Sequence, residues 1–302
     1  MPSRKQIIQR IDDAIRRHRV TQGKGFRLRD HDPGDTGRMG SEDKPEAKEM
    51  LARGVDWLAQ QQDKLYAQDR RSLLLVFQAM DAAGKDGTIK HVMSGVNPQG
   101  VQVVSFKQPS AQELDHDFLW RYWRELPERG RIGIFNRSYY EEVLVVRVHR
   151  AILDAQKLPP ECLPKKIFEQ RLADIAHFED YLTRQGTQVL KFFLNVSRDE
   201  QKRRFMERLN EPSRNWKFSE ADVRERGHWD EYQSAYEQAI RATASPHAPW
   251  YVVPADNKWY LRLVVVAAVV QALEEMDLAY PRVGADKKHE IEKARSLLEN
   301  ER

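Results

Sequence analysis

The chain has 302 residues, enough for one large or two small domains with a sizeable core, and its 50 Lys and Arg nearly balance 46 Asp and Glu. The single cysteine, Cys162, excludes an internal disulfide and a metal site built from several cysteines. The longest uncharged apolar run, Leu263 to Leu273, is too short to span a bilayer, and residues 1–21 carry charges throughout, so we predict a cytoplasmic protein without a secretory signal.

The amino-terminal end of the chain is basic. Residues 1–39 contain ten Lys and Arg against five Asp, a local excess of +5, and the other 263 residues sum to −1. A basic arm on a neutral body indicates an anionic partner, but a solvated and partly disordered terminus explains the charge equally well. Residues 23–46, rich in Gly, Asp and Pro, predict an extended loop, and we interpret residues 1–45 as a basic extension.

From Pro45 onward, helical patterns alternate with short apolar runs. The helical pattern that begins at Pro45 is followed by runs typical of buried strands at 73–77, 101–106, 132–135, 189–194 and 250–253. Long amphipathic segments lie between or after them, at 111–126, 164–184, 199–209, 219–242 and 257–276. This alternation predicts a parallel sheet covered on both faces by helices. Residues 286–302 predict a charged surface helix.

A loop of small residues follows the first apolar run. Residues 78–88, Gln-Ala-Met-Asp-Ala-Ala-Gly-Lys-Asp-Gly-Thr, lead from that strand into a helical stretch, which is the setting of a phosphate-binding loop. Against the pattern G-x-x-x-x-G-K-[ST], Ala79 replaces the first glycine and Asp86 replaces the hydroxyl residue after Lys85. An ordinary turn is the alternative, but strand, loop and helix together favour phosphate binding.

Asp81 is an unusual residue for such a loop. A carboxylate there repels phosphate unless a cation lies between them, so Asp81 fits a Mg²⁺ ligand or a group that orients the attacking phosphate. Capping of the following helix is the other interpretation. The spacing alone does not separate these two roles.

A second group of polar residues, Asn136-Arg137-Ser138-Tyr139-Tyr140, follows the strand at 132–135. Phosphate-loop enzymes often place an acidic Mg²⁺ ligand at the end of a neighbouring strand, and here that position holds the neutral Asn136. Arg137 would lie at the carboxyl end of a strand, where open α/β sheets bind ligands. A turn residue and a surface ion pair are the simpler interpretations of these two positions.

The segment from Arg198 to Arg226 is rich in charge, with nine Lys and Arg among seven acidic residues. By itself this pattern is typical of a solvated helical face. Next to a phosphate loop, it also fits a helical lid that closes over phosphates and excludes water.

Taken together, these motifs resemble the polyphosphate kinase 2 family. The resemblance rests on Asp81–Thr88, on Phe106–Pro109 with His116–Arg121, on Phe135–Glu141 and on Pro254–Tyr260, and it extends over roughly residues 25–275. It implies one thymidylate-kinase-like P-loop domain over 1–302, a three-layer α/β fold with a central parallel sheet. It also implies a helical lid at 198–241 and leaves a charged tail at 280–302.

The resemblance implies roles for individual residues. Asp81, Lys85 and Arg137 would be catalytic, and Asp81 would also bind Mg²⁺. The implied phosphate- and nucleotide-binding residues are Ala82, Ala83, Gly84, Asp86, Gly87, Thr88 and Asn136. The implied residues of the polyphosphate site and lid are Lys107, Arg198, Lys202, Arg204, Arg208 and Lys217.

The activity implied is Mg²⁺-dependent phosphoryl transfer between inorganic polyphosphate and nucleotides, from AMP to ADP and from ADP to ATP. Asn136, Ala79 and the long amino-terminal segment resemble the subgroup described as class III, which accepts nucleoside mono- and diphosphates. Guanine nucleotides are a further candidate, a homo-oligomer is expected, and neither a membrane nor a specific nucleic acid is expected as partner.

Two other functions stay open on the sequence. An ATP-dependent nucleoside monophosphate kinase would have the same fold and phosphate loop. A catalytically weak polyphosphate-binding protein is favoured by Ala79 and Asn136, whereas Asp81 and Lys85 argue against it.

Overall fold

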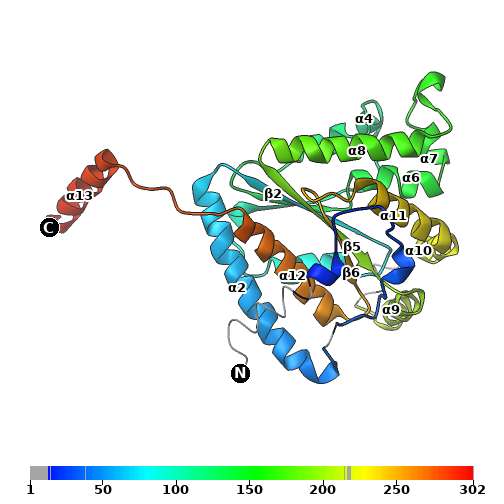
Figure 1. Cartoon of the computed structure of the whole chain (residues 1–302), viewed down its shortest axis with the longest axis horizontal. Helices are drawn as coiled ribbons and strands as arrows, with labels where there is room; N and C mark the ends of the chain where they lie inside the picture. Colours follow the sequence, from blue (N-terminus) through cyan, green and yellow to red (C-terminus); the bar gives the residue numbers. More distant parts are fainter. Residues whose placement is uncertain (1–12, 14, 38, 214, 216–218, 302) are drawn as a thin grey trace.

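Six strands form one sheet at the centre of the computed structural model, which describes residues 13, 15–37, 39–213, 215 and 219–301 (Figure 1). They lie in the order β1-β6-β5-β2-β4-β3. The five strands β2 to β6 run parallel, and β1 is antiparallel to β6. The strands are β1 Arg19–Val20, β2 Ser72–Ala79, β3 Val101–Ser105, β4 Ile132–Asn136, β5 Thr187–Asn195 and β6 Trp250–Pro254.

The central strand is β2, every residue of which is buried. Its continuous run of large apolar side chains suits a strand covered by helices on both faces. It pairs with β4 on one side and with β5 on the other. Strands β3 and β4 lie on one side of β2, and β5 and β6 lie on the other, so the chain crosses β2 after β4. Ligands bind at the carboxyl ends of strands where the order of an α/β sheet reverses in this way.

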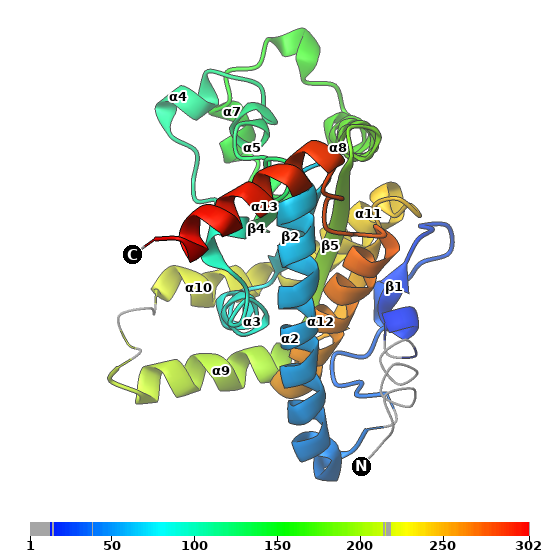
Figure 2. The same ribbon diagram turned by 90° about the vertical axis from the view of Figure 1, so that its left-hand side faces the viewer.

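Helices cover both faces of the sheet (Figures 1 and 2). Helices α2, α3 and α12 lie on one face, and α8 and α11 lie on the other. The apolar segment that is too short for a membrane span forms most of the buried helix α12, which packs closely on α2 where Gly54 faces Val266. The three layers predicted from the sequence are confirmed. The helices are α2 Lys44–Gln68, α3 Lys85–Val92, α4 Ala111–Leu114, α5 Trp120–Trp123, α6 Val145–Val148, α7 Ala151–Asp154, α8 Ile167–Arg184, α9 Arg198–Asn210, α10 Glu220–Glu225, α11 Trp229–Thr243, α12 Lys258–Glu275 and α13 Ala285–Glu299.

Three of the predicted elements differ from the structure. The run at 101–106 is not a buried strand: β3 lies at the edge of the sheet, and half of the Val103 side chain is exposed. The segment 111–126 forms two short helices rather than one, with a turn between them in which Asp117 accepts a hydrogen bond from the Leu119 amide. The segment 219–242 is interrupted at Arg226–His228, a 3-10 turn that contains Gly227.

Part of the amino-terminal extension packs against the body of the protein. Strand β1 extends the sheet, and Ile15, His18, Phe26 and Leu28 are buried. The interpretation of a solvated, disordered terminus is therefore wrong for this part of the extension. Residues 1–12 lie outside the described residues, and an anionic partner for the basic arm stays a prediction.

Burial of His18 makes stability depend on pH. Its ring contacts the Tyr260 hydroxyl at 3.1 Å, and desolvation lowers its pKa from 6.5 to about 4. Between these values the unfolded chain binds a proton that the folded chain does not, so stability falls as the pH falls through this window. We expect the free energy of unfolding to lose up to about 3 kcal/mol from this group, measured by urea unfolding at several pH values. The variant His18→Gln should show a flatter profile between pH 6.5 and 4, and an unchanged profile would contradict the assignment.

Helix α13 stands away from the rest of the molecule on an extended segment (Figure 1). All of its residues are exposed, which confirms the charged surface helix expected near the end of the chain. Across the described part of the chain, no helix combines the length and apolar character needed to cross a membrane.

Candidate active site

The phosphate loop connects β2 to α3 at the carboxyl edge of the sheet. Its backbone turns sharply at Ala82, with φ of 59°, and at Gly84, with φ of 105°. The left-handed region is open to glycine but costly for alanine, so Ala82 is held there by its surroundings. Arg137, which follows β4, has φ of 66° and its amide donates to the Phe77 carbonyl of β2. Left-handed backbone at two adjacent loops is typical of a functional site.

Asp81 does not cap the helix that follows the loop. The amino-terminal cap of α3 is Gly84, and no side chain bonds to the helix amides there. The Asp81 carboxylate instead forms an ion pair with Arg137, 3.6 Å from Nη2 to Oδ1, and about a third of its side chain is exposed. The contact joins the two motifs, and it argues against the helix-cap interpretation.

Lys85 bonds within the phosphate loop region, and Asn136 at the end of β4 joins the second motif to that loop. The Lys85 ammonium donates to the Ala79 carbonyl at the end of β2, over 3.1 Å. Burial lowers the pKa of Lys85, and the nearby Asp81 partly offsets this effect. The Asn136 amide nitrogen donates to the Asp86 carboxylate at 2.8 Å. The Thr88 hydroxyl bonds to the Gly84 carbonyl within α3.

A large cavity of about 840 Å³ opens beside the phosphate loop and is lined by the whole stretch Asp81–Thr88. Basic groups dominate its charged lining, which attracts polyanions. Two basic residues of α12, Lys258 and Arg262, contribute to it; they have no role in the sequence interpretation, although Lys258 belongs to a motif of the family resemblance. The lining contains seven basic side chains, Lys85, Lys107, Arg137, Arg204, Arg208, Lys258 and Arg262, against three acidic ones, Asp81, Asp86 and Glu207.

A smaller cavity of about 240 Å³ also adjoins the Asp81–Arg137 pair. Among the described residues, Asp81 and Arg137 line both cavities. Glu141 lines the smaller one, where burial raises its pKa, and the sequence analysis gave it no role although it ends the second motif. The charged and aromatic lining consists of Asp81, Glu141, Asp222, Glu225, Arg137, Arg226, His149, Tyr232 and Tyr236.

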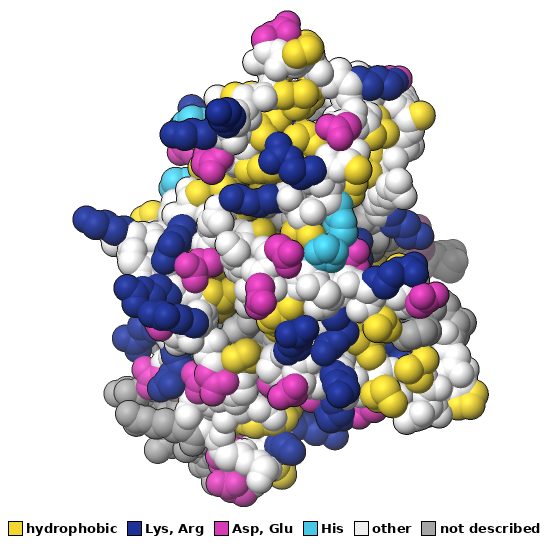
Figure 3. Space-filling model, turned by 90° about the vertical axis from the view of Figure 1, so that its right-hand side faces the viewer, with side chains coloured by type: hydrophobic (Ala, Val, Ile, Leu, Met, Phe, Trp, Pro, Cys, Tyr) yellow, Lys and Arg dark blue, Asp and Glu magenta, His cyan; other side chains and the backbone are white. Residues whose placement is uncertain are grey.

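The basic residues predicted for the polyphosphate site and lid lie in different places. Lys107 and Arg208 line the large cavity, and Arg208 also lies 4.0 Å from Asp222 of α10. Arg198 and Lys202 are exposed on α9 and belong to the lining of neither cavity. Lys217 lies outside the described residues. Figure 3 shows the face that carries α9, α10 and α11, where Lys and Arg side chains stand among acidic ones.

Arg204 borders the large cavity but points its guanidinium group into the protein. Its side chain is 5% exposed and its nitrogens donate to four backbone carbonyls, two of them in the phosphate loop, at Ala82 and Ala83. These bonds place Arg204 among the contacts that hold the loop.

A buried polar network supports the second motif from behind. The hydroxyls of Tyr139 and Tyr140 both donate to Oε1 of Glu179 in α8, at 3.0 and 2.8 Å. The other carboxylate oxygen of Glu179 pairs with the Lys191 ammonium of β5, and this pair is almost fully buried. The chain that follows Arg137 is thus fixed to both α8 and β5.

The parallel sheet, the phosphate loop and the basic cavity together define an enzyme of the P-loop kinase class. Residues 41–281 match the family model of polyphosphate kinase 2. The chain belongs to the polyphosphate kinase 2 family, as its sequence motifs led us to expect.

Individual relatives agree with this assignment. The chain is 50% identical to an ADP-polyphosphate phosphotransferase of Rhodopseudomonas palustris, over 85% of this chain and 89% of the relative. It is 43% identical to an AMP/ADP-polyphosphate phosphotransferase of Meiothermus ruber, over 89% and 96%. The crystal structure of polyphosphate kinase 2 from Arthrobacter aurescens superposes with a TM-score of 0.84 at 41% identity, over 93% and 95%.

Proposed function

We propose that this enzyme transfers phosphoryl groups between inorganic polyphosphate and adenine nucleoside mono- and diphosphates, converting AMP to ADP and ADP to ATP. The observation that carries the proposal is the pair of cavities of opposite charge that meet at Asp81 and Arg137. Two substrates held in the two cavities would meet at this pair, where transfer from one phosphate to the other requires them to be positioned together. The names of the relatives from Rhodopseudomonas palustris and Meiothermus ruber support the same substrates.

The charge of each cavity favours a different substrate. The large cavity has an excess of basic groups, and Lys and Arg sets of this kind hold linear polyanions. The small cavity has four carboxylates against two arginines, which disfavours a polyanion but suits the hydroxyl and amino groups of a nucleoside. We therefore place polyphosphate on the phosphate loop and the nucleotide in the small cavity, with its phosphate end toward Arg137.

The residues at the junction fit Mg²⁺ carried mainly by phosphate. This ion is usually held by one or two carboxylates together with substrate phosphates. Among the described residues, no group of three His, Cys, Asp or Glu side chains could hold a metal by itself, whereas the partly exposed Asp81 carboxylate lines both cavities. Asp81 would hold the ion, which would neutralise phosphate charge during transfer. Lys85 and the loop amides would hold the donor phosphate, and Arg137 would orient the acceptor.

Residues 198–241 complete the proposed site as a lid. Arg208 of α9 lines the large cavity, and Asp222 of α10 lines the small one. Closure of this segment over bound phosphates would exclude water and protect the transferred group from hydrolysis.

The decisive experiment supplies AMP, ADP, GMP or GDP together with polyphosphate and Mg²⁺ in the absence of ATP. We expect ADP and ATP to form, identified after chromatographic separation of the products. If products form only in a parallel reaction that contains ATP in place of polyphosphate, the protein is a nucleoside monophosphate kinase instead. Binding of polyphosphate with no turnover of any nucleotide would establish a binding protein. The guanine arms of the assay show the base preference.

Polyphosphate affinity should fall steeply as salt rises, because each neutralised phosphate releases a counterion on binding. Replacing Lys107 or Arg208 by glutamine should make the plot of log affinity against log salt shallower by about one charge. The matched control is Arg184→Gln at the end of α8, which should leave the slope unchanged. A wild-type affinity that does not change with salt would rule out the basic cavity as the polyphosphate site.

The variant Asp81→Asn tests the proposed Mg²⁺ ligand. We expect a melting temperature near that of the wild type, because the ion pair of the Asp81 carboxylate with Arg137 is partly exposed. Turnover should fall by about 10-fold or more at limiting Mg²⁺ and recover partly at higher Mg²⁺, since losing even a residue that only supports a metal ligand weakens metal sites by about 10- to 100-fold. Turnover and melting are measured on one preparation during a Mg²⁺ titration. Wild-type activity at limiting Mg²⁺ would remove Asp81 from the metal site.

A further inference from the structure

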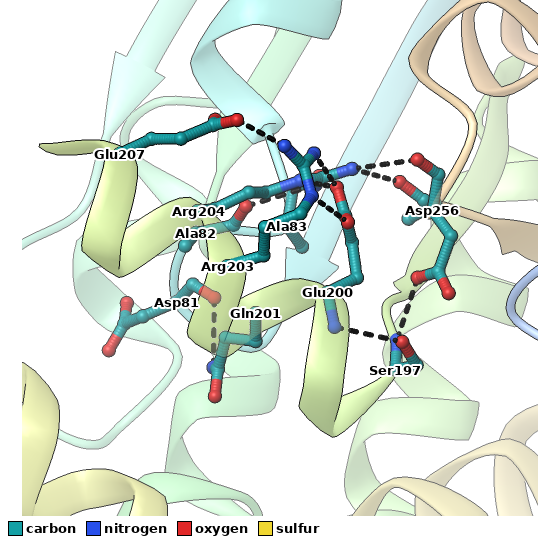
Figure 4. A network of polar contacts seen from close by, with 11 residues as sticks. Asp81, Ala82, Ala83, Ser197, Glu200, Gln201, Arg203, Arg204, Glu207 and Asp256 are labelled. Carbon is teal, nitrogen blue, oxygen red and sulfur yellow. Dashed lines mark hydrogen bonds and ion pairs between the residues drawn. The ribbon is translucent and has the colours of Figure 1, made fainter.

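Two side chains of α9 bind three successive carbonyls of the phosphate loop (Figure 4). The Gln201 amide nitrogen donates to the Asp81 carbonyl at 2.9 Å. The Arg204 guanidinium donates through one nitrogen to the carbonyls of Ala82, at 3.0 Å, and Ala83, at 2.8 Å. Because the two residues are three positions apart on a helix, they lie on the same face of α9. We call Gln201 and Arg204 the α9 clamp.

The clamp fixes the direction of the loop amides as well as its carbonyls. The peptide group is planar and trans, so its N–H points opposite to its C=O. Holding the carbonyls of residues 81–83 therefore sets the N–H groups of residues 82–84. The Ala83 amide donates to the Met80 carbonyl within the loop, and Ala82, Ala83 and Gly84 all line the large cavity. Carbonyl oxygens repel an anion and amides attract it, so this orientation is the one that phosphate needs.

Further hydrogen bonds hold both residues of the clamp in place. A second guanidinium nitrogen of Arg204 donates to the carbonyls of Ala255, at 2.5 Å, and Asp256, at 3.2 Å, in the connection from β6 to α12. Glu200 accepts from Arg204 Nε at 2.6 Å. The Gln201 carbonyl oxygen accepts from Arg226, which lines the small cavity, also at 2.6 Å. The clamp thus connects the phosphate loop to the wall of the second cavity.

We infer that Gln201 and Arg204 are positioning residues that keep the phosphate loop in its anion-binding conformation. This inference deepens the proposed function, since it concerns the same loop, and it assigns Arg204 a role other than direct contact with polyphosphate. The left-handed backbone at Ala82 is unfavourable for an alanine, which leaves that conformation when its surroundings relax, so the contacts of the clamp are needed to maintain it. Gln201 is 2% exposed and uncharged, so it is not a counterion for a polyanion.

The test compares Gln201→Met, Arg204→Met and Arg204→Lys with the control Arg203→Met. Arg203 is the exposed neighbour of Arg204 on α9 and pairs with Glu207 and with Glu200, which also accepts from Arg204. Its loss changes the charge of the helix as much as Arg204→Met does and leaves the donors to the loop carbonyls in place. For each variant we would measure the melting temperature, kcat and KM for both substrates, and the affinity for tripolyphosphate as a function of salt. Tripolyphosphate binding requires no turnover, so the clamp is tested even if polyphosphate proves not to be the phosphoryl donor.

We expect Gln201→Met and Arg204→Met to lower kcat/KM for polyphosphate by about 100-fold, the size of effect that a 1 Å misplacement causes. The KM for the nucleotide should change less, and the salt dependence of tripolyphosphate binding should keep its wild-type slope. Arg204→Lys should recover part of the activity, because an ammonium still reaches one or two of the carbonyls.

Three results would overturn the inference. In the first, the turnover of Gln201→Met stays within about two-fold of that of the wild type. In the second, the salt slope of Arg204→Met falls by about one charge, as it would for a residue that contacts the polyanion directly. In the third, Arg203→Met loses as much activity as Arg204→Met. If Arg204→Met does not fold, Gln201→Met and Arg204→Lys decide the question alone.

Discussion

Replacing Lys85 by methionine is expected to lower turnover by about 100- to 1000-fold, the usual loss when one preorganised charge-stabilising group is removed. Lys85 lines the large cavity and is the basic residue of the phosphate loop itself. Its ammonium is held in place by the Ala79 carbonyl at 3.1 Å. A methionine of similar length fills the same space but offers no charge to the transferred phosphoryl group. The measurement is kcat and KM with polyphosphate and AMP at saturating Mg²⁺.

The fold should tolerate this replacement. Burial penalises the charged form of Lys85, which is why its pKa is lowered, and an apolar side chain removes that penalty together with the hydrogen bond to the Ala79 carbonyl. Melting temperatures of variant and wild type should therefore agree within a few degrees. Lys90→Met, at an exposed position of the same helix, is the matched control and should retain full activity. Turnover of Lys85→Met close to that of the wild type would exclude Lys85 from the phosphate site.

The layers of the fold could be predicted because the apolar pattern of most segments matches the burial of those segments in the structure. The apolar run at 73–77 has no polar face, and the structure buries all of it at the centre of the sheet. The run at 101–106 was interpreted in the same way although it contains Gln102 and Ser105, and β3 lies at the sheet edge. Apolar periodicity reports what a strand can bury, whereas the position of a strand in the sheet depends on contacts far away in sequence.

The site could be predicted as far as its motifs are contiguous in sequence. Asp81 and Arg137 were named from separate motifs, and the parallel pairing of β2 with β4 brings them to 3.6 Å. The small cavity depends on Glu141, which ends the second motif, and on Asp222 and Glu225, which come from a distant segment whose local pattern is that of an ordinary charged surface. The family resemblance implied a polyphosphate role for Arg204, and a position in a motif does not show which way a guanidinium points. Orientation of that kind follows from packing.

Replacing Lys191 by methionine is expected to lower the free energy of unfolding by about 3–5 kcal/mol, the usual cost of leaving one member of a buried ion pair without its partner. The Lys191–Glu179 pair is at most 1% exposed. Burial favours the neutral form of each group, raising the pKa of Glu179 and lowering that of Lys191, so each charge is stabilised mainly by the other. Urea unfolding of wild type and variant at pH 7 measures the difference.

The double variant Lys191→Met, Glu179→Gln separates the unpaired charge from the loss of packing. Glutamine keeps an oxygen that can accept from the hydroxyls of Tyr139 and Tyr140, and it carries no charge that needs the ammonium. The double variant should therefore recover most of the lost stability, together with the position of the chain that follows Arg137. If Lys191→Met unfolds at the same urea concentration as the wild type, the pair does not support the second motif. If the double variant is as unstable as Lys191→Met, the loss comes from packing around the methionine and not from the carboxylate of Glu179.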